Sequence, residues 1–368
     1  MSHGKGLEGV IAGTTAISEI HDGVGGIRYR GYELSELCER STFEEVAFLL
    51  LHGRLPDRAE LSAFRQTLVN LRALPERMRL LLEQLPADAH PMDVLRTSVS
   101  AMGCFEPESR FRDQFAVAYQ LIASLGCCVV YWWIYHRQGR RIDTRIGDDT
   151  IAGNFLQTLL NRTPDRARLR ALDVSLIIYA EHEFNTSAFA ARVIASTLSD
   201  FHSAIAGAIG ALKGPLHGGA NQAAMELLAR FRTPEEAEAG IREMLGRGEK
   251  IMGFGHPVYK HRADPRGDLI KPWAVQLASE SEEGRRMLAV AERIERVMRS
   301  AGKPGPNVDF YTAIVYEQIG IPAPLATVLF ALARTVGWSA HILEQRADNQ
   351  IIRPSARYVG PAPRPYPG

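Results

Sequence analysis

The chain has 368 residues, with 43 Lys or Arg and 42 Asp or Glu, so its formal net charge at neutral pH is +1. Such a balance argues against nucleic acid or an anionic membrane as the main partner, because both attract a strong basic excess. The 46% hydrophobic and 23% charged fractions are those of a globular protein. The length suits two domains, or one large helical body with a subdomain.

The cysteines and the N-terminal residues indicate in which cellular compartment the protein is expected. Four Cys residues are few for this length and none forms a C-x-x-C pair, so we expect neither a zinc knuckle nor a disulfide framework. The opening MSHGKGLEGV lacks the apolar core of a signal peptide and the pattern of a transit peptide. The longest apolar stretch, residues 121–135, is shorter than the roughly 20 residues that span a membrane and predicts a buried helix. We therefore expect a cytoplasmic protein without a membrane partner.

The predicted elements begin with a small β-hairpin. Residues 10–20 and 27–29 flank a turn-rich spacer, which predicts two antiparallel strands. Thr42 and Glu45 form a capping box in front of an apolar helix, and residues 57–60 repeat the same device before the next one. From this point, helix signals dominate the chain.

The later elements extend the helical pattern. Apolar residues recur at helical spacing over 92–102, and Thr233-Pro234 starts another helix that Gly246 closes. Residues 187–211 are crowded with Ala, Ser and Gly. This composition predicts either a long helix that is buried or lies at an interface, or an ordinary helix in which Ala serves only its high helix propensity. The Pro-rich tail 359–368 predicts an extended segment over the surface or over a partner subunit. The sequence thus predicts a mostly α protein.

Three of the 11 histidines have unusual neighbours. His182 lies in AEHEFN, His217 in GPLHGGAN and His256 in MGFGHPVYK. Imidazole readily acts as acid or base near neutral pH, and flanking glycines let a ligand come close, although a single His beside Gly is more often a turn or capping residue. No second ligand stands at metal-site spacing from His182, and residues 253–255 lack the third Gly of a dinucleotide fingerprint. We therefore expect no metal.

Taken together, the motifs resemble the citrate synthase family. HEFN, GPLHGGAN, MGFGHPVYK, NVDFY and RPSARY follow one another in the family's order, and the similarity extends from LEGVIAGTTAISEI to IIRPSARYVGP. Within the family, HPMDV, YAEHEFN, GHPVY and NQIIRPSA are more similar to the 2-methylcitrate synthases. Lys260 and the Asp309-Phe310-Tyr311 run look more like plain citrate synthases.

The resemblance implies an acyltransferase that condenses an acyl-CoA with oxaloacetate and water. Propionyl-CoA would give 2-methylcitrate and CoA, with acetyl-CoA also accepted. The first alternative is a citrate synthase that uses acetyl-CoA. The second is an inactive helical binding or regulatory homologue, which loss of His217, His256 or Asp309 would favour; all three residues are present. The CoA thioester is a substrate, and no cofactor is implied.

The resemblance also implies a role for each motif residue. Asp309 would remove the α-proton of the acyl group, His217 would donate a hydrogen bond to the thioester oxygen, and His256 would polarise and protonate the ketone. The residues implied to bind the carboxylates and ketone of oxaloacetate are His182, Arg266, Arg334 and, from the partner subunit of a homodimer, Arg353. The residues implied to meet CoA are Ile251, Gly253, Phe254, Gly255 and Lys260.

The implied fold is mostly α, the two-domain helical fold of citrate synthases with a small N-terminal β-hairpin. Residues 1–217 and 323–368 would form a large domain that dimerises. Residues 218–322 would form a small domain on the CoA side, which closes over the site and excludes water. We expect a homodimer, or a larger assembly of such dimers.

Overall fold

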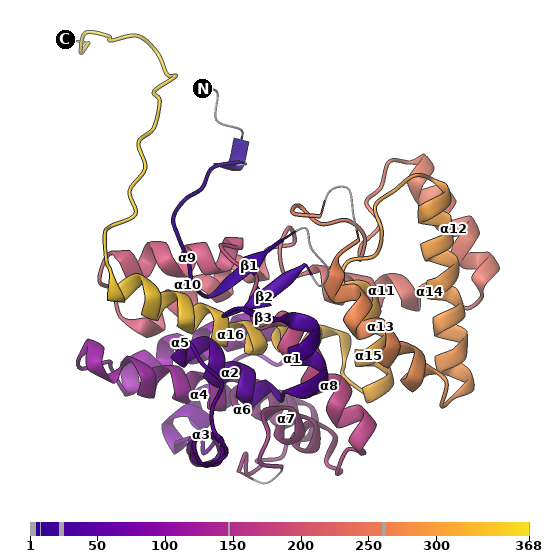
Figure 1. Ribbon diagram of the computed structural model, residues 1–368, viewed down its shortest axis with the longest axis horizontal. Coiled ribbons are helices and arrows are strands. Elements are labelled where there is room, and N and C mark those ends of the chain that lie inside the picture. Colours follow the sequence, from indigo (N-terminus) through magenta and orange to yellow (C-terminus); the bar gives the residue numbers. More distant parts are fainter. Residues whose placement is uncertain (1–4, 8, 22–25, 146–147, 260–262, 368) are drawn as a thin grey trace.

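The computed structural model describes residues 5–7, 9–21, 26–145, 148–259 and 263–367. These residues form a helical body with one small antiparallel sheet near the N-terminus (Figure 1). Its strands pair in chain order, and they are β1 (Ser18–Ile20), β2 (Ile27–Tyr29) and β3 (Tyr32–Glu33). The predicted hairpin is confirmed, although only the end of its first segment pairs and a third short strand is added. The hairpin turn, residues 22–25, lies outside the described residues.

The rest of the described chain is helical, apart from loops and single 3₁₀ turns at η1 (Lys5–Leu7) and η2 (Phe111–Asp113). The helices of the first half are α1 (Leu34–Arg40), α2 (Phe43–His52), α3 (Arg58–Asn70), α4 (Glu76–Gln84), α5 (Pro91–Phe105), α6 (Gln114–Gln138), α7 (Ile151–Leu160) and α8 (Arg166–Tyr179). Those of the second half are α9 (Thr186–Ser196), α10 (Phe201–Lys213), α11 (Ala220–Ala229), α12 (Pro234–Gly246), α13 (Pro265–Ala278), α14 (Glu282–Ser300), α15 (Val308–Ile319) and α16 (Ala323–Ala347).

The predicted helix starts are confirmed by the hydrogen bonds at their caps. Thr42 Oγ1 accepts from the backbone N–H of Glu45, whose carboxylate accepts from the N–H of Thr42, so α2 begins with a complete capping box. Asp57 and Glu60 form the same box at α3, and Thr233 caps α12. Each cap satisfies backbone donors that have no partner within the first helical turn.

The prediction of one helix over residues 187–211 was wrong, because this segment forms α9 and α10. The chain breaks at Leu198, whose φ of 64° is left-handed. Asp200 then accepts a 2.9 Å hydrogen bond from the backbone N–H of Ser203 and starts α10. A good N-cap in the middle of an Ala-rich run favours a new helix over a continuous one.

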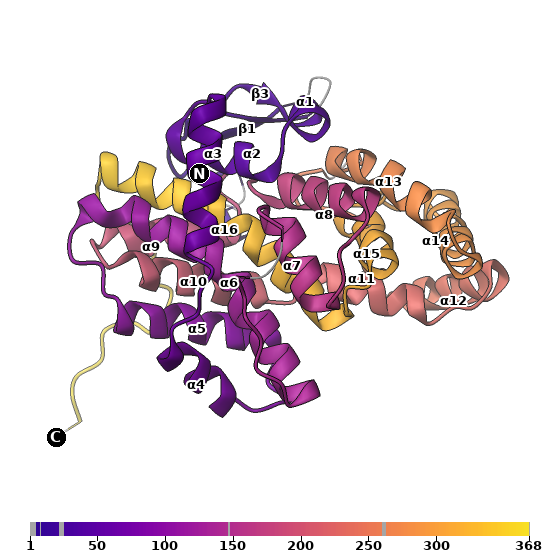
Figure 2. The same cartoon turned by 90° about the horizontal axis from the view of Figure 1, so that it is seen from below.

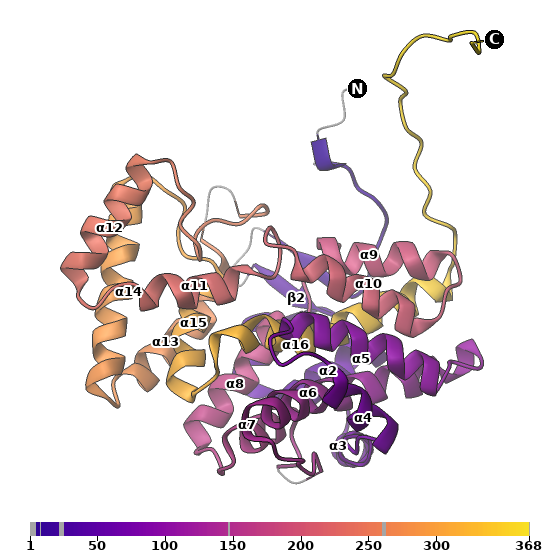
Figure 3. The same ribbon diagram turned by 180° about the vertical axis from the view of Figure 1, so that it is seen from behind.

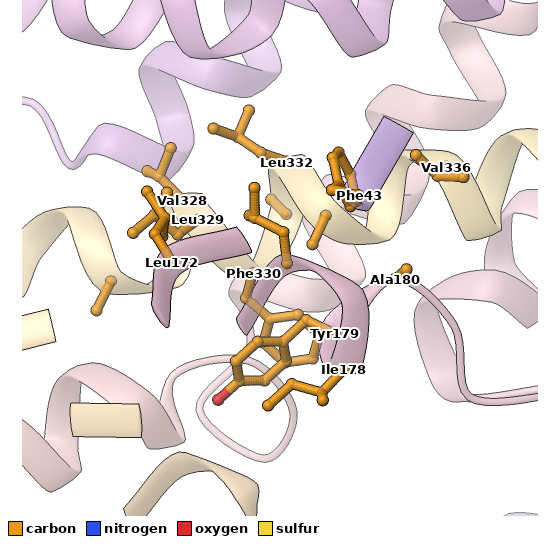
Figure 4. Packing of buried hydrophobic residues seen from close by; sticks show 14 of the residues in the cluster. Phe43, Leu172, Ile178, Tyr179, Ala180, Val328, Leu329, Phe330, Leu332 and Val336 are labelled. Atoms are coloured by element: carbon orange, nitrogen blue, oxygen red, sulfur yellow. The ribbon is translucent and has the colours of Figure 1, made fainter. Parts of the chain in front are cut away.

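Helix α16 is the centre of the fold. It contacts α2, α5, α6, α8, α9, α10 and α11, and the views from below and from behind show it running through the body (Figures 2 and 3). Phe330 on α16 packs against Tyr179 at the end of α8, with 4.5 Å between ring centroids (Figure 4). Within the described residues, α6 and α16 have the length and apolarity of a membrane span, but 72% and 100% of their most apolar windows are buried in the protein. The predicted buried helix is thereby confirmed in α6.

Helices α11 to α15 lie together at one end of the molecule in both views (Figures 1 and 2). Among them α13 packs against α15, and it also touches α8. After α16, residues 351–367 form no helix or strand and extend away from the body (Figures 1 and 3). The tail forms no regular structure, as predicted, but it extends away from the body and does not lie over its surface, and its contact with a partner stays a prediction.

Candidate active site

One cavity of about 810 Å³ brings together ten of the twelve residues that the family resemblance singles out. They are His182, His217, Ile251, Gly253, Phe254, Gly255, His256, Arg266, Asp309 and Arg334. Of the other two, Arg353 lies in the exposed tail, away from the cavity of its own chain, and Lys260 lies outside the described residues. Residues from both halves of the sequence therefore share one site.

Asp309 stands in the first turn of α15, which Asn307 caps by accepting the Asp309 N–H at 3.0 Å. The Tyr179 hydroxyl donates to Asp309 Oδ1 at 2.6 Å and accepts from Asn221 Nδ2 at 2.9 Å. Burial raises the pKa of Asp309 to about 6, against the opposing effects of the Tyr179 hydrogen bond and the charge of Arg266. The carboxylate thus accepts the Tyr179 hydrogen bond through Oδ1, and it has a proton affinity that suits a base near neutral pH.

His217 follows α10 in a turn in which its own N–H bonds to Gly214 O at 2.9 Å. Burial and the nearby charge of Arg334 lower the pKa of His217 to about 3, so the imidazole is neutral. Its Nε2 lies 2.9 Å from Ser187 Oγ. A neutral imidazole in this position can donate a hydrogen bond only from the nitrogen that carries its single proton.

Ser187 controls which nitrogen that is. Its Oγ accepts a 3.0 Å hydrogen bond from Trp338 Nε1 and has one proton to donate, either to Asn185 Oδ1 at 2.8 Å or to His217 Nε2 at 2.9 Å. When the hydroxyl donates to His217, the ring proton stands on Nδ1. The serine therefore couples the tautomer of His217 to its own orientation.

The loop that carries His256 is fixed by Asn307. The Asn307 N–H donates to Gly253 O at 2.9 Å, and its side-chain amide donates to Gly255 O at 3.0 Å. Gly253 has a φ of 85°, and a Cβ there would lie 2.8 Å from the ring of Phe310, so the loop requires glycine. Asn307 thus joins the loop directly to the helix start that presents Asp309.

His256 and His182 form an edge-to-face pair, with ring centroids 5.1 Å apart. Burial and the charge of Arg266 lower the pKa of His256 to about 4, and the same two causes lower that of His182. His182 Nε2 also shares a 2.8 Å hydrogen bond with the Tyr259 hydroxyl. Both rings are therefore neutral and lie side by side in the cavity wall.

The two arginines in the cavity differ in how much of each guanidinium is free. Arg266 is bound through Nε and Nη2 to the two oxygens of Asp264, at 3.0 and 2.8 Å. Arg334 donates only Nε, to Tyr179 O at 2.7 Å, and both of its buried Nη atoms have no hydrogen-bond partner among the described residues. An open, buried guanidinium is a strong site for a carboxylate. Burial lowers the pKa of Arg334 to about 10, which still leaves it charged at neutral pH.

Sequence reasoning missed several residues that position these groups. Asn221 and Tyr259 lie within GPLHGGAN and GHPVYK, so the motifs contained them without marking their function. Tyr179 is likewise the first residue of YAEHEFN, whereas Ser187 lies in none of the motifs and a serine in an Ala-rich helix is ordinary. Within the described residues, no group of three His, Cys, Asp or Glu could hold a metal ion.

Comparison with known proteins agrees with this fold. A family model described as citrate synthase, C-terminal domain, matches residues 6–355. The chain is 47% identical to 2-methylcitrate synthase of Shewanella oneidensis over 98% of this chain and 96% of that protein. It is 41% identical to citrate synthase 2 of Bacillus subtilis, over 98% and 97%.

A solved structure extends the comparison. Citrate synthase from Thermoplasma acidophilum, solved as a ternary complex with carboxymethyl coenzyme A and oxaloacetate, matches with a TM-score of 0.90 and 33% identity. The match covers 98% of this chain and 97% of that one. The chain therefore belongs to the citrate synthase family, and it is an enzyme.

Proposed function

We propose that this enzyme condenses propionyl-CoA with oxaloacetate and water to form 2-methylcitrate and CoA. One observation carries the proposal: a carboxylate with a raised pKa, neutral imidazoles and an open guanidinium face the same cavity. This set matches what an enolising condensation needs, namely a base, neutral hydrogen-bond donors and a carboxylate anchor. The choice of the propionyl group is supported by the 47% identity to a protein named 2-methylcitrate synthase.

The first step is loss of a proton from the carbon next to the thioester. Asp309 takes this proton through the oxygen that Tyr179 does not hold. His217 donates a hydrogen bond to the thioester oxygen as enolate character develops, with its proton on Nδ1 and its Nε2 accepting from Ser187. Preorganised donors of this kind stabilise developing charge without reorganising during the reaction.

The second step joins the enolate carbon to the ketone carbon of oxaloacetate. Arg334 binds a carboxylate through its two free Nη atoms, and Arg266, held by Asp264, lies in the same wall. His182 contacts oxaloacetate, and His256 donates a hydrogen bond to the ketone oxygen and protonates it as the new bond forms. Water then hydrolyses the thioester, which releases CoA.

The remaining proposals concern CoA and assembly. Ile251, Gly253, Phe254 and Gly255 line the cavity and form the backbone surface against which CoA binds, with Lys260 nearby in sequence. Residues 218–322 close over the site as a small domain on the large one formed by 1–217 and 323–368. The chain acts as a homodimer, in which the exposed tail delivers Arg353 to the partner's site.

Citrate formation from acetyl-CoA is the second candidate. It is favoured by the 41% identity to citrate synthase 2 and by a 40% identical Bacillus subtilis relative named citrate/2-methylcitrate synthase. One methyl group in an apolar pocket discriminates by only about 1–3 kcal/mol. We therefore propose that acetyl-CoA reacts as well, more slowly.

The test is thiol release from propionyl-CoA, and in parallel from acetyl-CoA, with and without oxaloacetate, followed by mass spectrometry of the product. The proposal predicts release that depends on oxaloacetate and a product with the mass of 2-methylcitrate. Release without oxaloacetate would indicate a simple thioesterase. No release from either acyl-CoA would favour the inactive homologue.

A further inference from the structure

A buried chain of polar contacts begins beside Arg334 and is not used by the reaction described above. Glu181 Oε1 lies 2.9 Å from His341 Nε2, and His341 Nδ1 lies 3.0 Å from Arg192 Nη1. Arg192 also donates to Glu344 Oε2 at 2.7 Å. The side chains of Glu181 and His341 are fully buried, whereas that of Glu344 is 22% exposed. This series of polar contacts thus runs from the interior beside Arg334 outward to Glu344.

The direction of these hydrogen bonds fixes the charge of His341. Arginine can only donate, so His341 Nδ1 must accept from Arg192 and has no proton. The single ring proton is then on Nε2 and is donated to Glu181. His341 is therefore neutral in this arrangement. Glu344 balances the charge of Arg192, so neither His341 nor Arg192 neutralises the charge of Glu181.

Glu181 is ionised and lies close to Arg334. Burial opposes ionisation, but the hydrogen bonds from His341 and Ser18 and the charge of Arg334 favour the carboxylate and lower the pKa of Glu181 below its ordinary value. A Cβ added at Gly337 would stand 2.3 Å from Glu181 Oε2 and 3.3 Å from Arg334 Cδ, so both side chains crowd the same point on α16. Only glycine leaves room for this approach.

Glu181 and Arg334 nevertheless form no direct hydrogen bond. Glu181 Oε2 and both Nη atoms of Arg334 are buried without a hydrogen-bond partner among the described residues. A buried cation needs a counter-charge. A nearby carboxylate that makes no hydrogen bond to the guanidinium supplies this charge and leaves both Nη atoms free to bind a ligand. We infer that Glu181 is the built-in counter-anion of Arg334: it stabilises the cation in the empty site and, by repelling the substrate carboxylate, limits how tightly the site holds it. It is a positioning residue that acts through Arg334.

This inference rests on the proposed binding of oxaloacetate by Arg334, and Glu181→Gln tests it. Glutamine keeps the shape and an oxygen for His341 and Ser18, which donate to Oε1 at 2.9 and 3.0 Å, and removes only the charge. We expect calorimetric titration to show oxaloacetate binding about threefold tighter or more, because a like charge has been removed. If the substitution only disrupted the local structure, oxaloacetate would bind more weakly. Tighter binding therefore indicates that the charge of Glu181 opposes oxaloacetate.

The matched control is Glu344→Gln, which removes the same charge at the far end of the chain of contacts. It should leave the dissociation constant for oxaloacetate unchanged, and neither variant should alter the KM for acyl-CoA. Weaker or unchanged oxaloacetate binding in Glu181→Gln, or equal tightening in both variants, would overturn the inference. If the wild-type enzyme itself failed to bind oxaloacetate, the proposed function would fail instead.

A stability cycle tests the pairing without substrate. Glu181→Gln and Arg334→Gln each leave one buried charge without its partner, whereas the double variant leaves none. The double variant should therefore melt at a higher temperature than Glu181→Gln, or restore soluble expression if that single variant does not fold. Purely additive losses, or a double variant as insoluble as the single one, would overturn the inference.

Discussion

The hydroxyl of Tyr179 donates a 2.6 Å hydrogen bond to Asp309, 130 residues further along the chain. Both side chains are buried, and the hydroxyl is itself oriented by Asn221. The bond favours the ionised carboxylate and opposes the effect of burial, so it keeps the pKa of the proposed base below neutral pH. The packing of α8 against α15 therefore affects the pKa of Asp309, because it sets the position of the Tyr179 hydroxyl.

Replacing Tyr179 by Phe should shift the pH dependence of the reaction. With the pKa of Asp309 at about 6, kcat/KM for acyl-CoA should fall below about pH 6 as the base becomes protonated. Loss of a hydrogen bond to a charged group should move this acid limb upward by about one pH unit. Tyr316→Phe removes a buried hydroxyl that contacts Ser175 instead and should leave the limb in place. An unshifted limb in Tyr179→Phe would contradict this tuning.

Asp309→Asn should abolish condensation and stabilise the fold. The pKa of Asp309 is raised on folding, so the ionised carboxylate costs stability above about pH 6, and below the pKa of about 4 in the unfolded chain this cost is absent. Two pKa units correspond to about 2–3 kcal/mol. Asparagine can still accept from Tyr179 and carries no charge.

Melting curves at two pH values measure this effect. The variant should melt a few degrees above the wild type at pH 8, and the gap should close near pH 4. Oxaloacetate binding should be largely retained, since the base acts on the other substrate. Near-normal turnover would show that Asp309 is not the base, and a lower melting temperature at pH 8 would contradict the stability argument.

The resemblance to the citrate synthase family singled out twelve residues, and the structure brings ten of them to one cavity. Within the family motifs, His256 follows Gly255, and Asp309 follows the Asn307 cap. The groups that tune these residues were not found. Tyr179, Ser187 and Glu181 act through partners more than 25 residues away in sequence, and no local pattern marks such tertiary contacts.

For the fold, too, features that depend on neighbouring residues were predicted, and others were missed. Capping boxes were read correctly because both partners lie within one helical turn. The break between α9 and α10 was missed although Asp200 with Ser203 is an N-terminal capping signal, since the Ala-rich composition of the run outweighed it. The third strand was also missed, because β3 has only two residues and no alternation to detect.

Ser187→Ala should reduce turnover by roughly tenfold or more while leaving oxaloacetate binding unchanged. Without the hydroxyl, nothing in this position donates to His217 Nε2, so the neutral ring no longer favours the tautomer that donates from Nδ1. The comparison is with Ser339→Ala, which removes a buried hydroxyl that donates to the α16 backbone at Thr335 O. Equal turnover in the two variants would show that Ser187 does not set the tautomer.

Mixing two inactive variants should test the proposed sharing of sites between subunits. If Arg353 completes the partner's site, Arg353→Ala and His217→Ala subunits should together form heterodimers with one intact site. Activity should then recover after subunit exchange, in proportion to the heterodimer fraction measured by mass spectrometry. Demonstrated exchange without recovery would place Arg353 outside the site.

The most direct test of the central claim is the kcat/KM for propionyl-CoA and acetyl-CoA, measured on one preparation with saturating oxaloacetate. The proposed function predicts that both react and that propionyl-CoA is preferred by about tenfold or more. A clear preference for acetyl-CoA would contradict the proposed substrate and identify citrate as the product, with the roles of Asp309, His217 and His256 unchanged.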